Sequence, residues 1–115
     1  MALVATAALA LAACGREKEP DLVNGKTLFV QKCGSCHTLG RGNTRGVTGP
    51  NLDEAFQVGR REGMNEKTIQ GIVRKQIANP LRGSSMPPDL VSNEDARDVA
   101  AYVARAAAQP TPRAA

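Results

Sequence analysis

Aromatic residues are scarce in this 115-residue sequence: they make up 3% of the chain, and tryptophan is absent. Larger apolar residues are also few, because only 19 residues from Cys14 onward are Leu, Val, Ile or Phe. That count lies just under the ~20% level below which chains tend toward disorder. The high net charge that usually accompanies disorder is missing, since the chain carries +4. We therefore exclude a large aromatic core and expect a folded domain with a thin core or with a bulky apolar group at its centre.

Two further absences limit the classes of function. No block of Lys and Arg is interleaved with aromatic residues, so the sequence excludes a strongly basic nucleic-acid binder. No apolar run reaches the roughly 18 residues that a membrane span requires. Residues 1–13 are nearly all apolar, and a short run of this kind is typical of the hydrophobic region of an export signal.

The end of this apolar segment, Leu11-Ala12-Ala13-Cys14, resembles a bacterial lipobox. In that pattern the signal (1–13) is cleaved before Cys14, and Cys14 carries a lipid anchor. The positive residues that open most export signals do not follow Met1, so an ordinary cleaved signal and a plain apolar N-terminus remain alternatives. Both signal interpretations place the domain outside the cytoplasm. With lipidation, it lies in the bacterial periplasm or at the outer face of the cytoplasmic membrane, anchored through Cys14.

Composition divides the rest of the chain into three parts. We expect residues 14–21 (CGREKEPD) to form the lipidated N-terminus and a charged tether, and residues 22–108 to form the folded domain. Residues 109–115 (QPTPRAA) contain two prolines and no apolar period, so we expect a disordered tail.

Helix signals recur three times within the folded part. Apolar residues at helical spacing, bounded by capping residues or proline, predict helices over about 22–32, 66–78 and 92–107. Ser92 can cap the third helix, and Asp95 three residues later resembles a capping box. Residues 53–57 can form a short helical turn. No segment shows sustained strand alternation, so the predicted class is all-α, with three main helices and long ordered loops.

The residues Cys33-Gly34-Ser35-Cys36-His37 form a C-x-x-C-H sequence, which is typical of covalent attachment of a c-type haem. Two thiols three positions apart can each form a thioether with one haem vinyl group. The next residue, His37, is then held under the porphyrin, where its Nε2 can ligate the iron. Because the chain has only one histidine, His37 is the only imidazole available as an axial ligand.

Three other interpretations of the two cysteines remain open. An exported C-x-x-C pair can form a structural disulfide. A thioredoxin-like redox pair requires a βαβ context, and no strands are visible. A structural zinc site requires four ligands, whereas the chain offers Cys33, Cys36 and one histidine once Cys14 is assigned to the lipobox.

A second axial ligand from this chain would have to be a methionine. Met86 lies in a loop rich in Gly, Ser and Pro and is followed by Pro87 and Pro88. Proline favours extended geometry in the residue before it, which suits a stiff loop that presents one side chain. Met64 precedes the expected helix cap at Asn65 and fits a packing role better. The sequence favours Met86 as the distal ligand, and an exposed Met86 in a flexible loop is the alternative.

From about Asp21 to Ala107, the chain resembles a class I (mono-haem) cytochrome c. The resemblance includes the C-x-x-C-H sequence and the order of the helices and motifs. Three more features match it: Gly25 and Phe29 on the first helix with Tyr102 on the last, which resemble the crossing of the family's terminal helices, then Gly49-Pro50-Asn51-Leu52, and Met86-Pro87-Pro88. It implies a bundle of three main helices with loops wrapped around one covalent haem c. It also implies that the Pro50 carbonyl accepts a hydrogen bond from the other ring nitrogen of His37.

The resemblance implies a one-electron carrier rather than an enzyme, because His37 and Met86 fill both axial positions of the iron. Expected partners are membrane redox complexes, with a quinol-oxidising complex as donor and a terminal oxidase as acceptor. The alternative is a c-type haem with an open distal site that acts as a peroxidase or a gas-binding protein. A colourless module stabilised by zinc or a disulfide is the third class.

Overall fold

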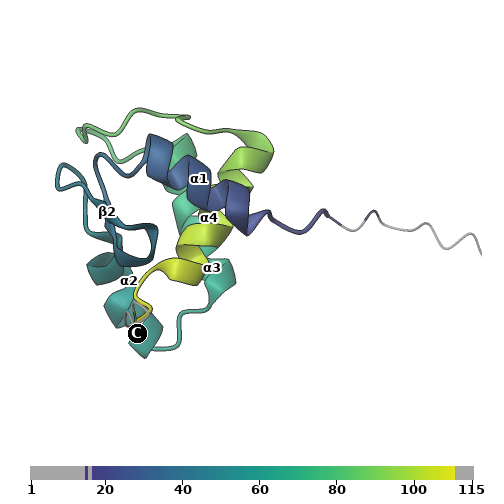
Figure 1. The fold of residues 1–115 in the computed structure, drawn as a ribbon, viewed down its shortest axis with the longest axis horizontal. Helices are drawn as coiled ribbons and strands as arrows, with labels where there is room; N and C mark the ends of the chain where they lie inside the picture. Colours follow the sequence, from purple (N-terminus) through teal and green to yellow (C-terminus); the bar gives the residue numbers. More distant parts are fainter. Residues whose placement is uncertain (1–14, 16, 111–115) are drawn as a thin grey trace, which may run out of the picture.

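The computed structural model describes residue 15 and residues 17–110, and these form a mostly helical domain (Figure 1). The elements follow in the order α1 (Leu22–Lys32), β1 (Thr38–Leu39), the 3-10 helix η1 (Gly40–Gly42), β2 (Thr44–Arg45), α2 (Leu52–Arg61), α3 (Glu66–Ala78) and α4 (Asn93–Ala106). The expected helices over 22–32 and 66–78 have the predicted bounds, and the third expected helix is α4.

Two elements differ from expectation. The segment near 53–57 is part of a full helix, α2, so the domain has four helices rather than three main ones. Residues Thr38–Leu39 also pair antiparallel with Thr44–Arg45, with Leu39 opposite Thr44. This two-residue ladder is too short to produce a recognisable alternation of polar and apolar residues.

At three helix starts, polar side chains accept hydrogen bonds from backbone N–H groups of the first turn. Asp21 caps α1 by accepting hydrogen bonds from the N–H groups of Val23 and Asn24 at 3.0 and 2.9 Å. Asn51 caps α2 in the same way, and Asn65 accepts from the N–H of Thr68 at 2.9 Å to cap α3. These bonds satisfy donors that have no partner within the helix.

The start of α4 is the exception. Ser92 stands at the N-cap position, as predicted, but its side chain makes no capping hydrogen bond. The next residue, Asn93, has a φ of 52°, which turns the first helical residue away from helical geometry. The capping-box prediction is therefore wrong, although the position of the helix start is correct.

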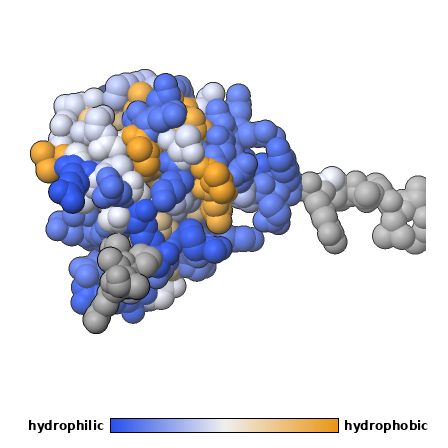
Figure 2. Space-filling view, in the orientation of Figure 1, coloured by the Kyte–Doolittle hydropathy of each residue, from blue (hydrophilic) through white to orange (hydrophobic). Residues whose placement is uncertain are grey.

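The last helix, α4, packs against both α1 and α3 and forms the centre of the domain (Figure 1). Most of its buried residues are small, and the largest fully buried side chains of the described residues are Phe29, Leu39, Ile69, Val99 and Val103. The core is thin, as the composition predicts. On the face in Figure 2, separate hydrophobic patches interrupt a mainly hydrophilic surface.

A glycine allows α1 and α4 to cross closely. A side chain on Gly25 would collide with the backbone carbonyl of Asp98, which explains why this position has no Cβ. Beside this contact, the rings of Phe29 and Tyr102 pack with centroids 6.0 Å apart and an interplanar angle of 55°. The predicted contact between the helices that carry Gly25 and Tyr102 is confirmed. Asn24 adds polar contacts, donating to Asp98 Oδ2 at 2.9 Å.

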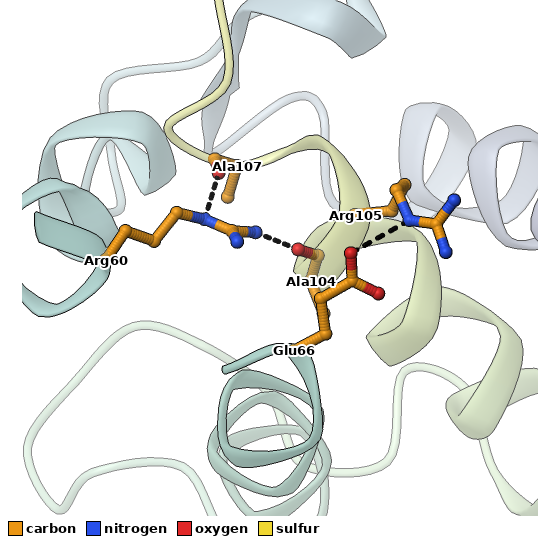
Figure 3. A network of polar contacts seen from close by, with 5 residues as sticks. All are labelled: Arg60, Glu66, Ala104, Arg105 and Ala107. Carbon is orange, nitrogen blue, oxygen red and sulfur yellow. Dashed lines mark hydrogen bonds and ion pairs between the residues drawn. The ribbon is translucent and has the colours of Figure 1, made fainter. Parts of the chain in front are cut away.

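Side chains from α2 hold the C-terminal end of α4 in place (Figure 3). The guanidinium of Arg60 donates to the carbonyls of Ala104 and Ala107, the latter at 2.7 Å. On the neighbouring helix α3, Glu66 forms an ion pair of 2.9 Å with Arg105. Because the last carbonyls of a helix have no partner within it, Arg60 acts as a side-chain cap that joins α2 to α4.

The residues just after α4 are also held. Ala108 N–H donates to Asp53 Oδ1 at 2.8 Å, and Arg41 donates through two nitrogens to the carbonyl of Pro110 at 3.2 and 3.0 Å. Gln109 and Pro110, which the composition assigned to the tail, are therefore in contact with the domain. The remainder of the expected tail, 111–115, lies outside the described residues, as do the expected signal and Cys14.

Candidate functional site

The C-x-x-C-H residues occupy one tight turn at the end of α1. Cys33 closes the helix, its N–H donating to the carbonyl of Phe29 at 2.8 Å. The carbonyl of Cys33 in turn accepts from the N–H groups of Cys36 and His37, at 3.1 and 3.0 Å. The two thiols and the imidazole are thus fixed to a single turn of backbone.

The two cysteines are free thiols with different surroundings. Cys36 is exposed, whereas Cys33 is buried, with 8% of its surface accessible. Burial raises the pKa of the Cys33 thiol to about 11, and the nearby Cys36 adds to the rise. Between the cysteines, a Cβ on Gly34 would lie 2.7 Å from Cγ2 of Thr44, so this position has no room for a side chain.

The imidazole of His37 is oriented by the backbone of a distant segment. Its Nδ1 lies 2.7 Å from the carbonyl oxygen of Pro50. A carbonyl can only accept a hydrogen bond, so Nδ1 carries the proton and the lone pair stays on Nε2. Gly49 packs directly against the ring, because a Cβ there would lie 2.6 Å from Cε1 and 3.0 Å from Nε2. The arrangement fixes one tautomer and leaves Nε2 able to ligate a metal.

The segment between His37 and Pro50 folds back against the C-x-x-C-H turn. Gly49 N–H donates to the carbonyl of Cys36 at 2.7 Å. A Cβ on Gly46 would lie 2.5 Å from backbone atoms of Cys36, so this glycine also permits a close approach of two backbones. Thr38 Oγ1 donates to the carbonyl of Gly46 at 2.9 Å and tightens the same contact.

Met86 lies on the long loop between α3 and α4. Its side chain is partly buried and packs against the core, and its sulfur accepts a hydrogen bond of 3.8 Å from Gln76 Nε2 on α3. The same loop is tied to α3 again, because Asp89 N–H donates to the carbonyl of Ile77 at 2.9 Å. The loop therefore presents Met86 with a defined orientation rather than as a free surface residue.

Met64, the other methionine considered as a ligand, has a different environment. It lies between α2 and α3, where a Cβ on Gly59 would meet its Cε at 2.8 Å and its Sδ at 3.1 Å. Its backbone N–H also donates to the carbonyl of Gly59 at 2.8 Å. These contacts make Met64 a packing residue of the α2–α3 connection.

The donor set fits a covalently attached haem. Two thiols and an Nε2 lone pair are carried by one turn, and three glycines (Gly34, Gly46 and Gly49) keep bulky side chains away from it. Within residues 17–110, no three His, Cys, Asp or Glu side chains come together as a metal-ligand cluster.

The comparisons with known proteins agree with this geometry. Residues 22–107 match the family model described as Cytochrome c. The chain belongs to the cytochrome c family. Haem c is therefore its covalent cofactor, and electron transfer is the class of function that membership implies. The match covers both cysteines, His37 and Met86.

A solved structure supports the same fold for this cytochrome. This chain resembles the c-type cytochrome SorU from Sinorhizobium meliloti, with 28% sequence identity and a TM-score of 0.60. The alignment covers 76% of this chain and 92% of SorU. Proteins of the c type are extracytoplasmic, which agrees with the expected export. In the part of the chain that the structure describes, no helix is long and apolar enough to cross a membrane.

Two residues near the site were not singled out from the sequence. Gln76 occupies the helical stripe of Ile69, Val73 and Ile77, and a polar residue at that spacing was the available signal. No sequence pattern indicated Thr44, because nothing in the sequence of a Gly-rich loop shows which hydroxyl side chain faces inward.

Proposed function

We propose that this cytochrome is a one-electron carrier in which Cys33 and Cys36 form the thioethers and His37 and Met86 are the axial ligands. The observation that carries the proposal is the hydrogen bond from His37 Nδ1 to the Pro50 carbonyl at 2.7 Å, which leaves the lone pair of Nε2 available to ligate the iron. Such a bond orients a ligating imidazole and raises its basicity. When bound, haem c supplies an iron that alternates between Fe(II) and Fe(III).

Met86 decides between a carrier and an open-site protein. A thioether paired with histidine raises the reduction potential and blocks the position where a gas or peroxide would bind. The bonds from Gln76 to Met86 and from Asp89 to Ile77 support a loop that holds the sulfur in place. The sequence contains no second histidine that could serve as a distal acid or base. These features favour electron transfer over peroxidase or gas-binding chemistry.

The test compares two methionine variants of the holoprotein. Ferric c-type cytochromes with a Met–iron bond show a weak far-red absorption band. We expect Met86→Ala to lose this band, to lower the potential and to bind added imidazole or azide. Met64→Ala is the matched control and should keep the band, because Met64 packs on Gly59. An intact band in Met86→Ala would overturn the assignment of Met86.

The proposed partners are membrane redox complexes, with a quinol-oxidising donor and a terminal oxidase as acceptor. We also propose that a lipid on Cys14 holds the domain at the membrane surface, which raises its local concentration near such partners. The described part of the tether supports a short connection. Arg97 donates to the carbonyl of Lys18 at 2.8 Å and lies 4.0 Å from Glu17. Four residues can span at most about 14 Å between Lys18 and the lipid.

Fractionation of cells that express the full chain tests the anchor. Wild-type haem protein should stay with membranes in high salt, and Cys14→Ser should move to the soluble fraction with an unchanged spectrum. Stable anchoring requires more than one acyl chain, because a single chain binds membranes only marginally. A normally processed wild-type protein that is released by salt alone would show that Cys14 carries no anchor.

A further inference from the structure

Thr44 is a buried polar residue, with 8% of its surface accessible. Its hydroxyl uses both of its hydrogen-bonding functions. Oγ1 donates to the carbonyl of His37 at 2.8 Å and accepts from the N–H of Leu39 at 3.0 Å. One hydroxyl is therefore hydrogen-bonded to the main chain on both sides of Thr38, the residue that follows the axial histidine.

The methyl group of Thr44 contacts the other half of the C-x-x-C-H turn. A Cβ on Gly34 would lie 2.7 Å from its Cγ2, so the methyl rests against the backbone between the two cysteines. Thr44 is also paired with Leu39 in the short β ladder. A β-branched side chain has restricted rotation about χ1, and the contacts on both sides hold Thr44 in its rotamer. The same side chain thus touches the cysteine turn through carbon and the His37 main chain through oxygen.

The position of Thr44 along the chain links these contacts to the imidazole. His37 and Pro50 close a loop through the Nδ1 hydrogen bond, and Thr44 lies about midway between them. Its bond to the His37 carbonyl divides this loop into two smaller ones. Rotation of the peptide after His37 would move the imidazole relative to the Pro50 carbonyl, and the Thr44 hydroxyl opposes that rotation.

We propose that Thr44 is a positioning residue for His37. Its hydroxyl fixes the main chain of His37, so that the imidazole Nδ1 keeps its hydrogen bond to the Pro50 carbonyl and Nε2 stays oriented toward the iron position. The inference rests on the proposed role of His37 as an axial ligand. A shorter, better-aligned hydrogen bond at Nδ1 makes the imidazole more basic, so that Nε2 donates more electron density to the iron and favours Fe(III). Loss of the Thr44 hydroxyl should therefore weaken that bond and raise the reduction potential.

The chain offers a matched control on the same loop. Thr38 Oγ1 also makes a backbone hydrogen bond, but its acceptor is the carbonyl of Gly46 and not that of His37. Thr44→Val removes the critical hydroxyl and keeps the branched shape, Thr44→Ser keeps the hydroxyl and removes the methyl, and Thr38→Val removes the control hydroxyl. A purely structural loop bond would make the two valine variants behave alike.

The experiment uses the three holoproteins and two readouts: the reduction potential, and the solvent exchange of the His37 Nδ1 proton measured by NMR in the diamagnetic ferrous state. For Thr44→Val we expect exchange about tenfold faster than wild type, equivalent to about 1.4 kcal/mol, together with a higher potential. Thr44→Ser and Thr38→Val should stay within about twofold of the wild-type exchange rate, because both keep the hydroxyl bond to His37.

Equal exchange rates and potentials in Thr44→Val and Thr38→Val would overturn the proposal. If Thr44→Val yields no holoprotein, Thr44→Ser decides alone. If Thr44→Ser has a lowered melting temperature but the wild-type Nδ1 exchange rate and reduction potential, the result supports the role of the hydroxyl. A shift of both the exchange rate and the potential in Thr44→Ser overturns that role. The far-red band of Met86 reports the carrier assignment separately, because Met86 lies on another loop. The Thr44 result therefore stands whichever way the Met86 test falls.

Discussion

Gly49 lies against the face of the His37 imidazole so closely that a Cβ atom there would come within 2.6 Å of Cε1. No real Cβ occupies such a position, so a side chain at residue 49 would displace the ring, the loop or both. Because the ring is bound to the next residue, Pro50, displacement of the ring would strain the 2.7 Å hydrogen bond at Nδ1. The pair therefore couples the absence of one side chain to the orientation of the proposed axial ligand.

Gly49→Ala should lower the yield of holoprotein and shift its reduction potential. Overpacking of this kind destabilises a protein by about 1–3 kcal/mol. Pro50→Ala is the control, because it keeps the backbone carbonyl that accepts from His37 and adds no atom against the ring. Haem content per protein and the potential are the measurements. A Gly49→Ala protein with wild-type haem content and potential would show that the loop adjusts without moving the imidazole.

Gly25→Ala should destabilise the holoprotein through the crossing of α1 and α4. The added Cβ meets the backbone carbonyl of Asp98, which cannot move aside as a flexible side chain could. We expect a loss of about 1–3 kcal/mol, measured as a lower midpoint of thermal or denaturant unfolding.

A second helical glycine provides the control for this prediction. A Cβ on Gly71 in α3 would meet nothing within 4 Å. Gly71→Ala should therefore stabilise the protein by roughly 0.5–1 kcal/mol, because alanine favours a helix more than glycine does. Equal effects of the two substitutions would mean that helix propensity, and not close packing, decides the result at Gly25.

Removal of the haem should abolish cooperative folding. The largest fully buried side chains within residues 17–110 are only Phe29, Leu39, Ile69, Val99 and Val103. Apolar burial contributes about 25 cal/mol per Å², so a covalent haem adds much of what this core lacks. We expect a Cys33→Ala/Cys36→Ala protein to unfold gradually on heating in circular dichroism. A sharp transition in this haem-free protein would contradict the prediction.

The elements predicted well from the sequence are those with local signals at both ends. The α3 helix begins after Asn65, which caps it, and ends before Asn79-Pro80, as predicted. In α2 the cap at Asn51 and the acidic first turn were present, but only Phe56 is buried and Gly59 weakens the helical pattern. Its full length therefore depends on contacts with the rest of the fold that no local pattern records.

The candidate site shows the same division. Cys33, Cys36 and His37 could be proposed from the sequence because their chemistry depends on a contiguous motif. The bond from His37 to Pro50 was expected only from the family resemblance, since it joins residues 13 positions apart. The role of Thr44 could not be predicted, because its hydroxyl meets His37 only when the loop has closed. The assignment of Met86 as distal ligand stays a prediction, with its bond to Gln76 as support.

Arg60→Ala should destabilise the domain by releasing the end of α4. The Arg60 guanidinium bonds the carbonyls of Ala104 and Ala107, and hydrogen bonds to charged groups contribute about 1.5–3 kcal/mol in buried settings. Arg60 is only partly buried, so water can replace part of these bonds, and a loss of about 1–2 kcal/mol is expected. For a domain of this size, that loss lowers the melting temperature by roughly 4–16 °C.

Two substitutions make the Arg60 prediction specific. Arg61 is the next residue and is exposed, so Arg61→Ala should change stability by no more than about 0.5 kcal/mol. Arg60→Lys keeps the positive charge, which favours a helix C-terminus, but lacks the planar fork that reaches two carbonyls at once. It should therefore recover only part of the loss in unfolding experiments on the holoprotein. Full recovery by lysine would mean that the charge near the end of α4, rather than the paired hydrogen bonds, stabilises the junction between α2 and α4.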